Sequence, residues 1–96
     1  MTKADIVNAI ASETNIDKSQ VSKSVEAFMD ILKNALGNGE NVYLRGFGTF
    51  EIKKRAEKKA RIISKNISVI VPEHHIPFFK PSSLFTEKVK NSDNIN

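Results

Sequence analysis

Apolar side chains recur at helical spacing through the first half of the chain. Ile6, Val7 and Ile10 form a short apolar stripe, which predicts an amphipathic helix over residues 3–14. A longer stripe, with steps of three and four residues, predicts a second helix over residues 18–37. The members of this second stripe are Val21, Val25, Phe28, Leu32 and Leu36. Stripes of this kind are typical of core packing, so we expect both helices to bury them.

Polar residues and glycines at the ends of the stripes predict where the helices begin and end. Thr2 and Asp5 have the spacing of a capping box ahead of the first helix. Asp17 can cap the second helix, with Gln20 at the reciprocal position. The sequence GNG at residues 37–39 predicts the end of that helix, because glycine and asparagine accept the left-handed backbone conformation.

The second half of the chain changes to a period of two, which is typical of strands. NVYLR, at residues 41–45, is rich in β-forming side chains, and GFG then breaks the segment. TFEI restarts the alternation, with Phe50 and Ile52 on one face and Thr49 and Glu51 on the other. We therefore expect a small antiparallel sheet to follow the two helices.

The alternation continues into residues 53–71, with the sequence KKRAEKKARIISKNISVIV. We predict one strand running on to Ile62 and a return strand over ISVIV up to Pro72, joined by a turn at SKN. A helix over KKRAEKKA is the alternative, because those residues have high helix propensity. The strand interpretation is favoured because β-branched sequence lies at both ends and no capping signal separates them.

A hairpin of this length would project from the rest of the molecule. Residues 49–62 would span about 45 Å at roughly 3.3 Å per residue, and no other segment remains to cover both faces of the ribbon. An isolated two-stranded ribbon is marginally stable in water. We therefore predict an arm that is mobile when free and is ordered by what it binds.

The C-terminal part of the chain predicts an extended segment and a last helix. IPFFKP contains prolines suited to an edge strand. Ser82 or Ser83 can cap a helix over SLFTEKVKN. Three side chains of this helix are expected to pack: Leu84, Phe85 and Val89. Residues 91–96 are expected to form a frayed tail.

Positive charge is concentrated in the predicted arm. Seven cations and Glu57 give residues 53–65 a formal charge of +6, so the remainder of this +4 chain sums to −2. The seven cations are Lys53, Lys54, Arg55, Lys58, Lys59, Arg61 and Lys65. A solvated charged face would usually be balanced by acids. The imbalance indicates a surface that binds a polyanion.

Patterns typical of enzymes and metal sites find little support. Cysteine is absent, which excludes a cysteine nucleophile, a disulfide and a thiolate metal site. His74 and His75 are adjacent and should point to opposite faces of an extended segment, so we interpret them as surface residues near a turn. GFGTFE lacks the third glycine of a nucleotide-binding loop and leads into a strand. We predict no enzymatic activity, cofactor, metal or small-molecule substrate.

Nucleic acid is the partner that these patterns favour. The helix starts near Lys3 and at Ser82 and Ser83 offer free backbone N–H groups to phosphates, and Lys80 lies beside the second start. The chain lacks the aromatic platform expected of a single-strand or RNA-binding module, and its one tyrosine, Tyr43, is expected to be packed. No targeting segment or apolar run of roughly 20 residues is found, so we expect a cytoplasmic protein without a membrane partner.

Two markers on either side of the arm resemble the HU/IHF family of bacterial nucleoid-associated DNA-bending proteins. GFGTFEIKKR, at residues 46–55, is the first marker, and IPFFKPSSL, at residues 76–84, is the second. Arg61 also falls on an arginine of the family. The resemblance runs from about residue 2 to residue 89 without apparent gaps.

The resemblance implies an α+β fold in a single domain over residues 1–96. The family pattern is an intertwined dimer with a helical base, a small antiparallel sheet and a protruding basic β-ribbon arm at about residues 53–71. Phe47, Phe50 and Phe79 would lie in the dimer core. A monomer core is the alternative, but it would leave the sheet uncovered.

The family also implies that the arms wrap the minor groove of duplex DNA and bend it with little sequence specificity, largely through phosphate neutralisation. The implied location is the nucleoid. The implied DNA contacts are Lys3, Lys53, Arg55, Lys58, Lys59, Arg61, Lys65, Lys80, Ser82 and Ser83. A site-selective, IHF-like protein acting in a heterodimer is the alternative to an HU-like homodimer. A protein of another class, whose arm binds RNA or an acidic partner, is a further alternative.

The arm tip departs from the family pattern. The family proline that wedges between base pairs is replaced by Ile63, and the turn glycine is replaced by Asn66. Ile63 is either an apolar wedge itself, as isoleucine is in other minor-groove binders, or an ordinary strand residue of a protein that bends DNA weakly. Ser83 stands where the family commonly has a lysine, so one phosphate contact is either lost or made by the hydroxyl.

Overall fold

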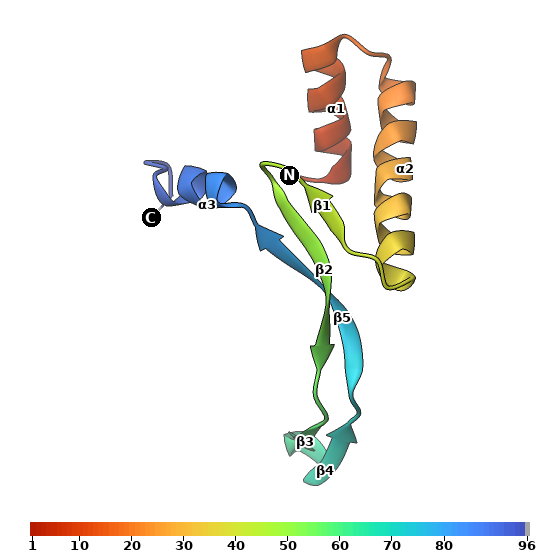
Figure 1. Cartoon of the computed structure of the whole chain (residues 1–96), viewed down its shortest axis with the longest axis vertical. Helices are drawn as coiled ribbons and strands as arrows, with labels where there is room; N and C mark the ends of the chain where they lie inside the picture. The colour runs from red at the N-terminus through yellow and green to blue at the C-terminus, as the bar shows by residue number, and fades with distance from the viewer. Residues whose placement is uncertain (96) are drawn as a thin grey trace.

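The computed structural model describes residues 1–95, apart from the side chain of Ile63. Two helices lead into a small sheet, a long ribbon follows, and a short helix comes last (Figure 1). The elements in chain order are α1 (Lys3–Thr14), α2 (Lys18–Gly37), β1 (Val42–Leu44), β2 (Gly48–Arg55), β3 (Lys58–Ile62), the 3-10 turn η1 (Ile63–Lys65), β4 (Ile67–Val71), β5 (His74–Pro81) and α3 (Ser83–Lys90). The predicted bounds of both long helices are confirmed.

The predicted capping box at the start of α1 is confirmed. The Thr2 hydroxyl accepts a hydrogen bond from the Asp5 backbone N–H at 3.3 Å, and the Thr2 backbone N–H donates to the Asp5 carboxylate at 2.8 Å. The backbone hydrogen bond, followed by one from the Thr2 hydroxyl, holds the pKa of Asp5 below its ordinary value. Asn15 ends α1 in the left-handed conformation, with φ of 60°.

The predicted side-chain cap of α2 is wrong. Asp17 occupies the N-cap position, but its carboxylate accepts no capping hydrogen bond, and Gln20 makes no reciprocal bond. Residues 17–20 are all exposed, so water can satisfy the first N–H groups of this helix without a side-chain partner. The last turn ends at Gly37, as the GNG sequence predicts.

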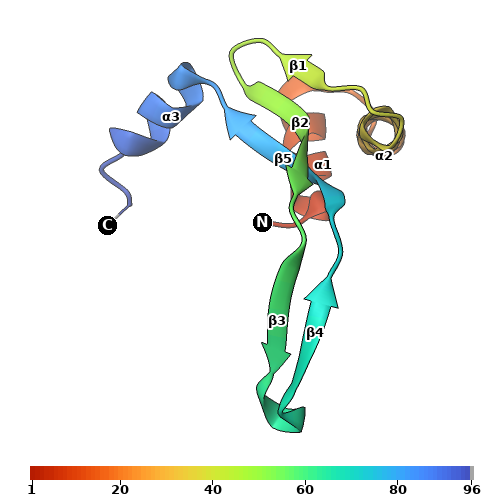
Figure 2. The same cartoon turned by 60° about the horizontal axis from the view of Figure 1, so that its bottom comes forward.

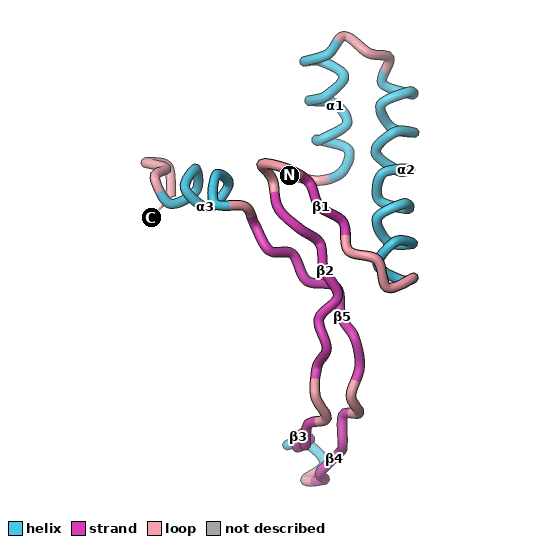
Figure 3. The backbone as a smooth tube through the Cα atoms, in the orientation of Figure 1, coloured by secondary structure: helices cyan, strands magenta, loops and turns pink. Residues whose placement is uncertain are grey.

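The strands form one long antiparallel hairpin with a third strand on one side. β2 lies at the centre of a three-stranded sheet in the order β1-β2-β5, and β3 and β4 form a separate two-stranded ladder. Arg55 pairs with His74 and Lys58 pairs with Val71, so the register is the same on both sides of a two-residue gap. The sequence-based choice of strand over helix for the arm is confirmed (Figure 3).

A gap in the ladder interrupts the arm, which was expected to be continuous. Ala56 and Glu57 lie on the outgoing strand of the gap, opposite Pro72 and Glu73 on the return strand. Proline has no backbone N–H and cannot donate to the ladder, which accounts for the break at this point. Because each strand skips the same number of residues, alternate side chains keep their faces across the gap.

The arm and the helices extend in different directions. The chain measures 55 × 35 × 29 Å, and the β3–β4 end lies far from the α1–α2 pair (Figures 1 and 2). At the tip, η1 and Asn66, with φ of 50°, reverse the chain at the predicted turn. β5 is an edge strand, in agreement with the prediction from its prolines.

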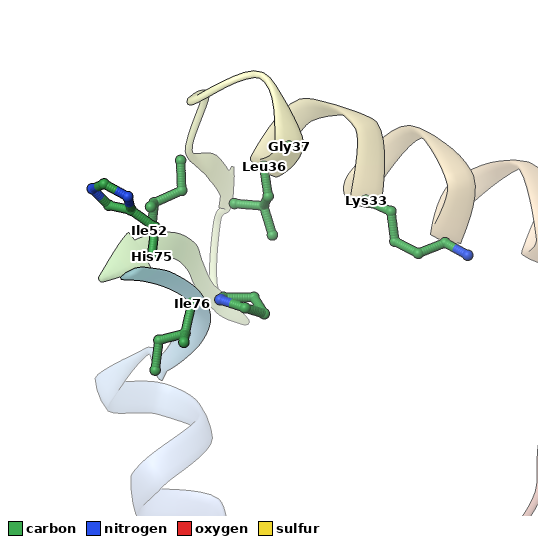
Figure 4. A pocket seen from close by; sticks show the side chains of 7 residues that line it. Lys33, Leu36, Gly37, Ile52, His75 and Ile76 are labelled. Atoms are coloured by element: carbon green, nitrogen blue, oxygen red, sulfur yellow. The ribbon is translucent and has the colours of Figure 1, made fainter. Parts of the chain in front are cut away.

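Very little of the chain is buried. Among the described residues, Val7 and Val21 are the only buried apolar side chains, and they lie where α1 and α2 meet. A hollow of about 410 Å³ separates the end of α2 from the sheet, with Leu36 on one side and Ile52 and His75 on the other (Figure 4). A single copy of this chain therefore leaves much of its apolar surface uncovered.

Several packing predictions are wrong for the single chain. Tyr43 is 73% exposed, Leu84 is 72% exposed and Val89 is 47% exposed. Two members of the helical stripes, Ile6 and Phe28, are exposed as well. Tyr43 lies on the short edge strand β1, on the face opposite that of its neighbours Val42 and Leu44. Val89 lines the apolar hollow beside Phe79 and Phe85, which stays open, and Leu84 is exposed elsewhere on α3.

Candidate nucleic-acid interface

An aromatic cluster fixes the sheet against α3. The Phe79 ring lies 5.1 Å from Phe47 and 4.7 Å from Phe50, and Phe47 stacks on Phe85 at 5.2 Å, measured between ring centroids. Phe47, Phe50 and Phe79 are the three phenylalanines that were expected in the dimer core, and Phe85 packs with them. Phe47 is still 44% exposed, so the cluster is only partly covered in a single chain.

Two glycines let the GFG turn approach β5. Gly46 has φ of 80°, a conformation that side chains other than glycine rarely adopt. A Cβ at Gly48 would lie 2.6 Å from the carbonyl oxygen of Lys80 and 2.7 Å from the Phe79 ring. The close approach brings the start of α3 beside the β1–β2 turn, and the Ser82 backbone N–H donates to the carbonyl of Phe47 at 2.8 Å.

The sheet has two unlike faces. One face carries Phe50, Ile52 and Phe79 and looks toward α2 and α3. We call the opposite one the open face. It comprises Tyr43, Thr49, Glu51, Lys53 and Arg55 together with their partners on β5, which are His74, Ile76, Phe78 and Lys80.

The predicted arm cations follow the ribbon from root to tip. Lys53 and Arg55 are on β2, Lys58, Lys59 and Arg61 are on β3, and Lys65 is in η1, and all six are exposed. Since alternate residues face opposite sides, Lys58 projects from one face of β3 and Lys59 and Arg61 from the other. The ribbon therefore presents positive charge on both faces.

Several cations have partners that sequence reasoning did not find. The Lys54 ammonium pairs with the Glu73 carboxylate at 2.9 Å, across the root of the arm. The Lys53 ammonium lies over the Phe78 ring, 4.2 Å from its centroid. The Arg61 guanidinium donates to the side-chain oxygen of Asn66 and so closes the tip.

Lys3 lies on the helical base, away from the arm. Its ammonium forms an ion pair with the Glu26 carboxylate on α2, and both side chains are about half exposed. A phosphate would therefore compete with Glu26 for this cation.

A polar hollow joins the β1–β2 turn to the start of α3. Its lining includes the expected Lys80, Ser82 and Ser83, and also Arg45 and Tyr43, which sequence reasoning did not select. The Ser82 hydroxyl is already engaged, since it donates to the Gly46 carbonyl at 2.8 Å and accepts from the Phe85 N–H at 3.2 Å. Arg45 directly precedes the GFG turn, and its position beside that marker was the signal that could have identified it.

The two histidines lie in a strand and not near a turn. His74 pairs with Arg55 and His75 with Lys54 in the β2–β5 ladder, so their side chains occupy opposite faces. Within residues 1–95, no group of three or more histidines, acids or cysteines is placed to hold a metal ion. No described helix combines the length and apolar character needed to cross a membrane.

The tip of the arm carries exposed isoleucines. Ile62 and Ile67 pair across the turn and are 37% and 48% exposed. The side chain of Ile63, the candidate wedge, lies outside the described part of the chain. The structure thus places an apolar pair beside the candidate position.

Comparison with known proteins identifies relatives along most of the chain. Residues 1–90 match the family model described as bacterial DNA-binding protein. The chain is 33% identical to DNA-binding protein HU of Staphylococcus aureus and 34% identical to that of Geobacillus stearothermophilus, in each case over 94% of this chain and 100% of the relative. The HU chain of an Anabaena HU–DNA cocrystal structure superposes with a TM-score of 0.90 at 30% identity, covering 96% of this chain and 100% of that chain.

Proposed function

Because the chain belongs to the HU/IHF family of bacterial DNA-binding proteins, we propose that it binds duplex DNA and bends it, without catalysing a reaction. The observation that carries this proposal is the exposed ribbon with cations on both faces. The relatives named above, one of them bound to DNA, support the same conclusion. The protein would act in the nucleoid.

Phosphate neutralisation is the main source of affinity in this proposal. The two phosphate backbones line the two sides of the minor groove, so a ribbon with Lys58 on one face and Lys59 and Arg61 on the other can contact both. Each contact releases condensed counterions, and the gain does not depend on the base sequence. Binding should therefore be only weakly sequence-specific.

The sheet and the helix starts would hold the flanking phosphates. Lys80 and Arg45 line the hollow beside the start of α3, where Ser83 is the first residue of the helix and offers its backbone N–H to a phosphate. The engaged Ser82 hydroxyl fixes the geometry of this helix start rather than contacting phosphate itself. Lys3 would join the flanking contacts by exchanging Glu26 for a phosphate.

We infer that the binding unit is an intertwined dimer. Phe28 and Ile31 on α2 are 48% and 68% exposed, and Leu84 on α3 is more exposed still. Soluble monomers rarely leave large contiguous apolar patches open. A second copy that packs on α2 and fills the hollow near Leu36 would bury these side chains and complete the phenylalanine cluster. A symmetric homodimer also supplies two arms, one for each side of a bend.

We propose Ile63 as the apolar wedge that kinks the duplex. It stands where the family has a proline, and Ile62 and Ile67 next to it supply apolar surface at the tip. Ile63→Ala should reduce the bend more than the affinity, because the phosphate contacts remain. Energy transfer between dyes at the two duplex ends measures the bend. Unchanged transfer, with affinity also unchanged, would exclude the wedge.

Footprinting on genomic fragments tests the proposed function and its nearest alternative together. Diffuse protection over the whole fragment is the expected result for an HU-like protein. Discrete protected sites that require a second, different subunit would favour an IHF-like heterodimer. An absence of protection at protein concentrations that saturate a short duplex would contradict both.

A further inference from the structure

Two exposed aromatic side chains lie on the open face, where phosphate binding gives them no role. Tyr43 is 73% exposed and Phe78 is 36% exposed. Both belong to the face that looks away from α2 and the phenylalanine cluster. The sequence predicted a packed Tyr43, and the structure contradicts that prediction.

The strand register places the two rings close together. Tyr43 pairs with Thr49, which pairs with Lys80, so these three side chains form one row across the sheet. Phe78 pairs with Glu51 in the next row of the same face. Two strand spacings and one two-residue step separate Tyr43 from Phe78, which corresponds to roughly 12 Å between their backbones. That distance exceeds the reach of one extended sugar–phosphate unit, so an extended polynucleotide bridges it with two bases that have one nucleotide between them.

Charge on the same face fits a polyanion. Arg45 and Lys80 line the hollow beside Tyr43, and the Lys53 ammonium lies 4.2 Å from the centroid of the Phe78 ring. Glu51 lies between the two rings and would repel a phosphate at that point. The arrangement therefore favours phosphates at the rim and bases in the middle.

Only an unpaired base can use such rings. In a duplex the flat faces of the bases are stacked on one another, whereas in a single strand they are available to aromatic side chains. Each base–aromatic stack strengthens binding by about 5- to 150-fold, with little dependence on base identity.

We propose that Tyr43 and Phe78 form a stacking site for the unpaired bases of single-stranded DNA, with Lys53, Lys80 and Arg45 contacting the adjacent phosphates. This activity goes beyond the duplex binding assigned to the arm, because it uses the centre of the sheet. Since duplex DNA would pass over the same face, the two ligands should compete.

Tyrosine fluorescence can report directly on the stacking of a base on Tyr43. Tyr43 is the only tyrosine and there is no tryptophan, so the intrinsic tyrosine fluorescence of the protein reports on Tyr43 alone. Titration with a thymidine 12-mer should quench this emission. An oligonucleotide of equal length and charge made of abasic sites should bind through its phosphates without quenching. Absence of quenching by the thymidine 12-mer at saturation would overturn the proposal.

Substitution separates stacking from phosphate binding. Tyr43→Thr combined with Phe78→Thr should weaken binding of the labelled thymidine 12-mer at least about 25-fold, with about fivefold from each ring. Duplex affinity should change by less than about threefold, because phosphate contacts dominate duplex binding. Tyr43→Phe is the matched control, since it keeps the ring, and it should bind both ligands like the wild type.

The outcomes distinguish this site from the duplex function. Loss of single-strand binding with duplex binding intact supports the stacking site. Unchanged single-strand affinity in the double variant, or equal losses for both ligands, would overturn it. Failure of the duplex function would instead appear as a wild-type protein that does not bind the duplex at all.

Discussion

Replacing Lys58, Lys59, Arg61 and Lys65 together by glutamine is expected to lower duplex affinity roughly a thousandfold or more at 50 mM salt. Each phosphate contact contributes about 0.9 to the slope of log affinity against log salt, and four are lost from every arm. Glutamine keeps much of the side-chain length and β-ladder geometry, so the change removes mainly charge. Fluorescence anisotropy with a labelled duplex of about two helical turns measures the effect.

Charge removal elsewhere provides the matched control. Four exposed lysines outside the arm, replaced by glutamine, lose the same total charge. These are Lys18, Lys23, Lys88 and Lys90. This control should lose far less affinity than the arm variant. Equal losses would mean that net charge, and not the ribbon, determines binding. Because the arm lies away from Val7 and Val21, the helical circular dichroism of the arm variant should match that of the wild type.

The largest effect on stability is expected from Phe79→Ala. The Phe79 ring contacts Phe47, Phe50 and Phe85 at centroid distances of 5.1, 4.7 and 6.1 Å. Truncation of a core phenylalanine costs about 3–5 kcal/mol, a large part of the 5–15 kcal/mol that stabilises a typical domain. The midpoint of thermal unfolding should fall by roughly 12 °C or more.

The neighbouring residue on the same strand supplies the control for this change. Phe78 points to the opposite, open face, so Phe78→Ala should cost about 1 kcal/mol or less. If Phe79→Ala were no more destabilising than Phe78→Ala, the phenylalanine cluster would not be the core.

Sedimentation tests the proposed dimer directly, because the wild-type particle should have twice the mass of one chain. Thermal unfolding gives a second test, since the unfolding midpoint of a dimer should rise with protein concentration.

The elements of this fold could be predicted from the sequence because their patterns are local. The apolar stripes and the polar residues and glycines at their ends give α1 and α2, and the alternation from Phe50 onward gives the ribbon. The arm was predicted against its helix propensity because β-branched residues flank it. The gap at Pro72 could also have been expected, since a proline facing a partner strand removes a ladder hydrogen bond.

Packing was less predictable because much of it depends on surfaces outside the single chain. Leu84 and Val89 are both exposed on α3, and Val89 lines an apolar hollow that stays open here. Helical spacing alone cannot tell what covers such side chains. Tyr43 was misplaced because the face of a three-residue edge strand depends on register.

The residues of the candidate site were likewise predictable from the sequence only in part. The arm cations could be predicted because their charge is concentrated in one segment. Arg45, Phe78 and the ion pairs Lys3–Glu26 and Lys54–Glu73 depend on contacts between distant parts of the chain, and only the folded structure brings these together.

The dependence of duplex affinity on salt tests the central claim most directly. If the six arm cations contact phosphates, log affinity should fall against log salt with a slope of about −5 or steeper, and the arm variant should show a much shallower slope. A wild-type affinity that stays flat between low and moderate salt would contradict the account.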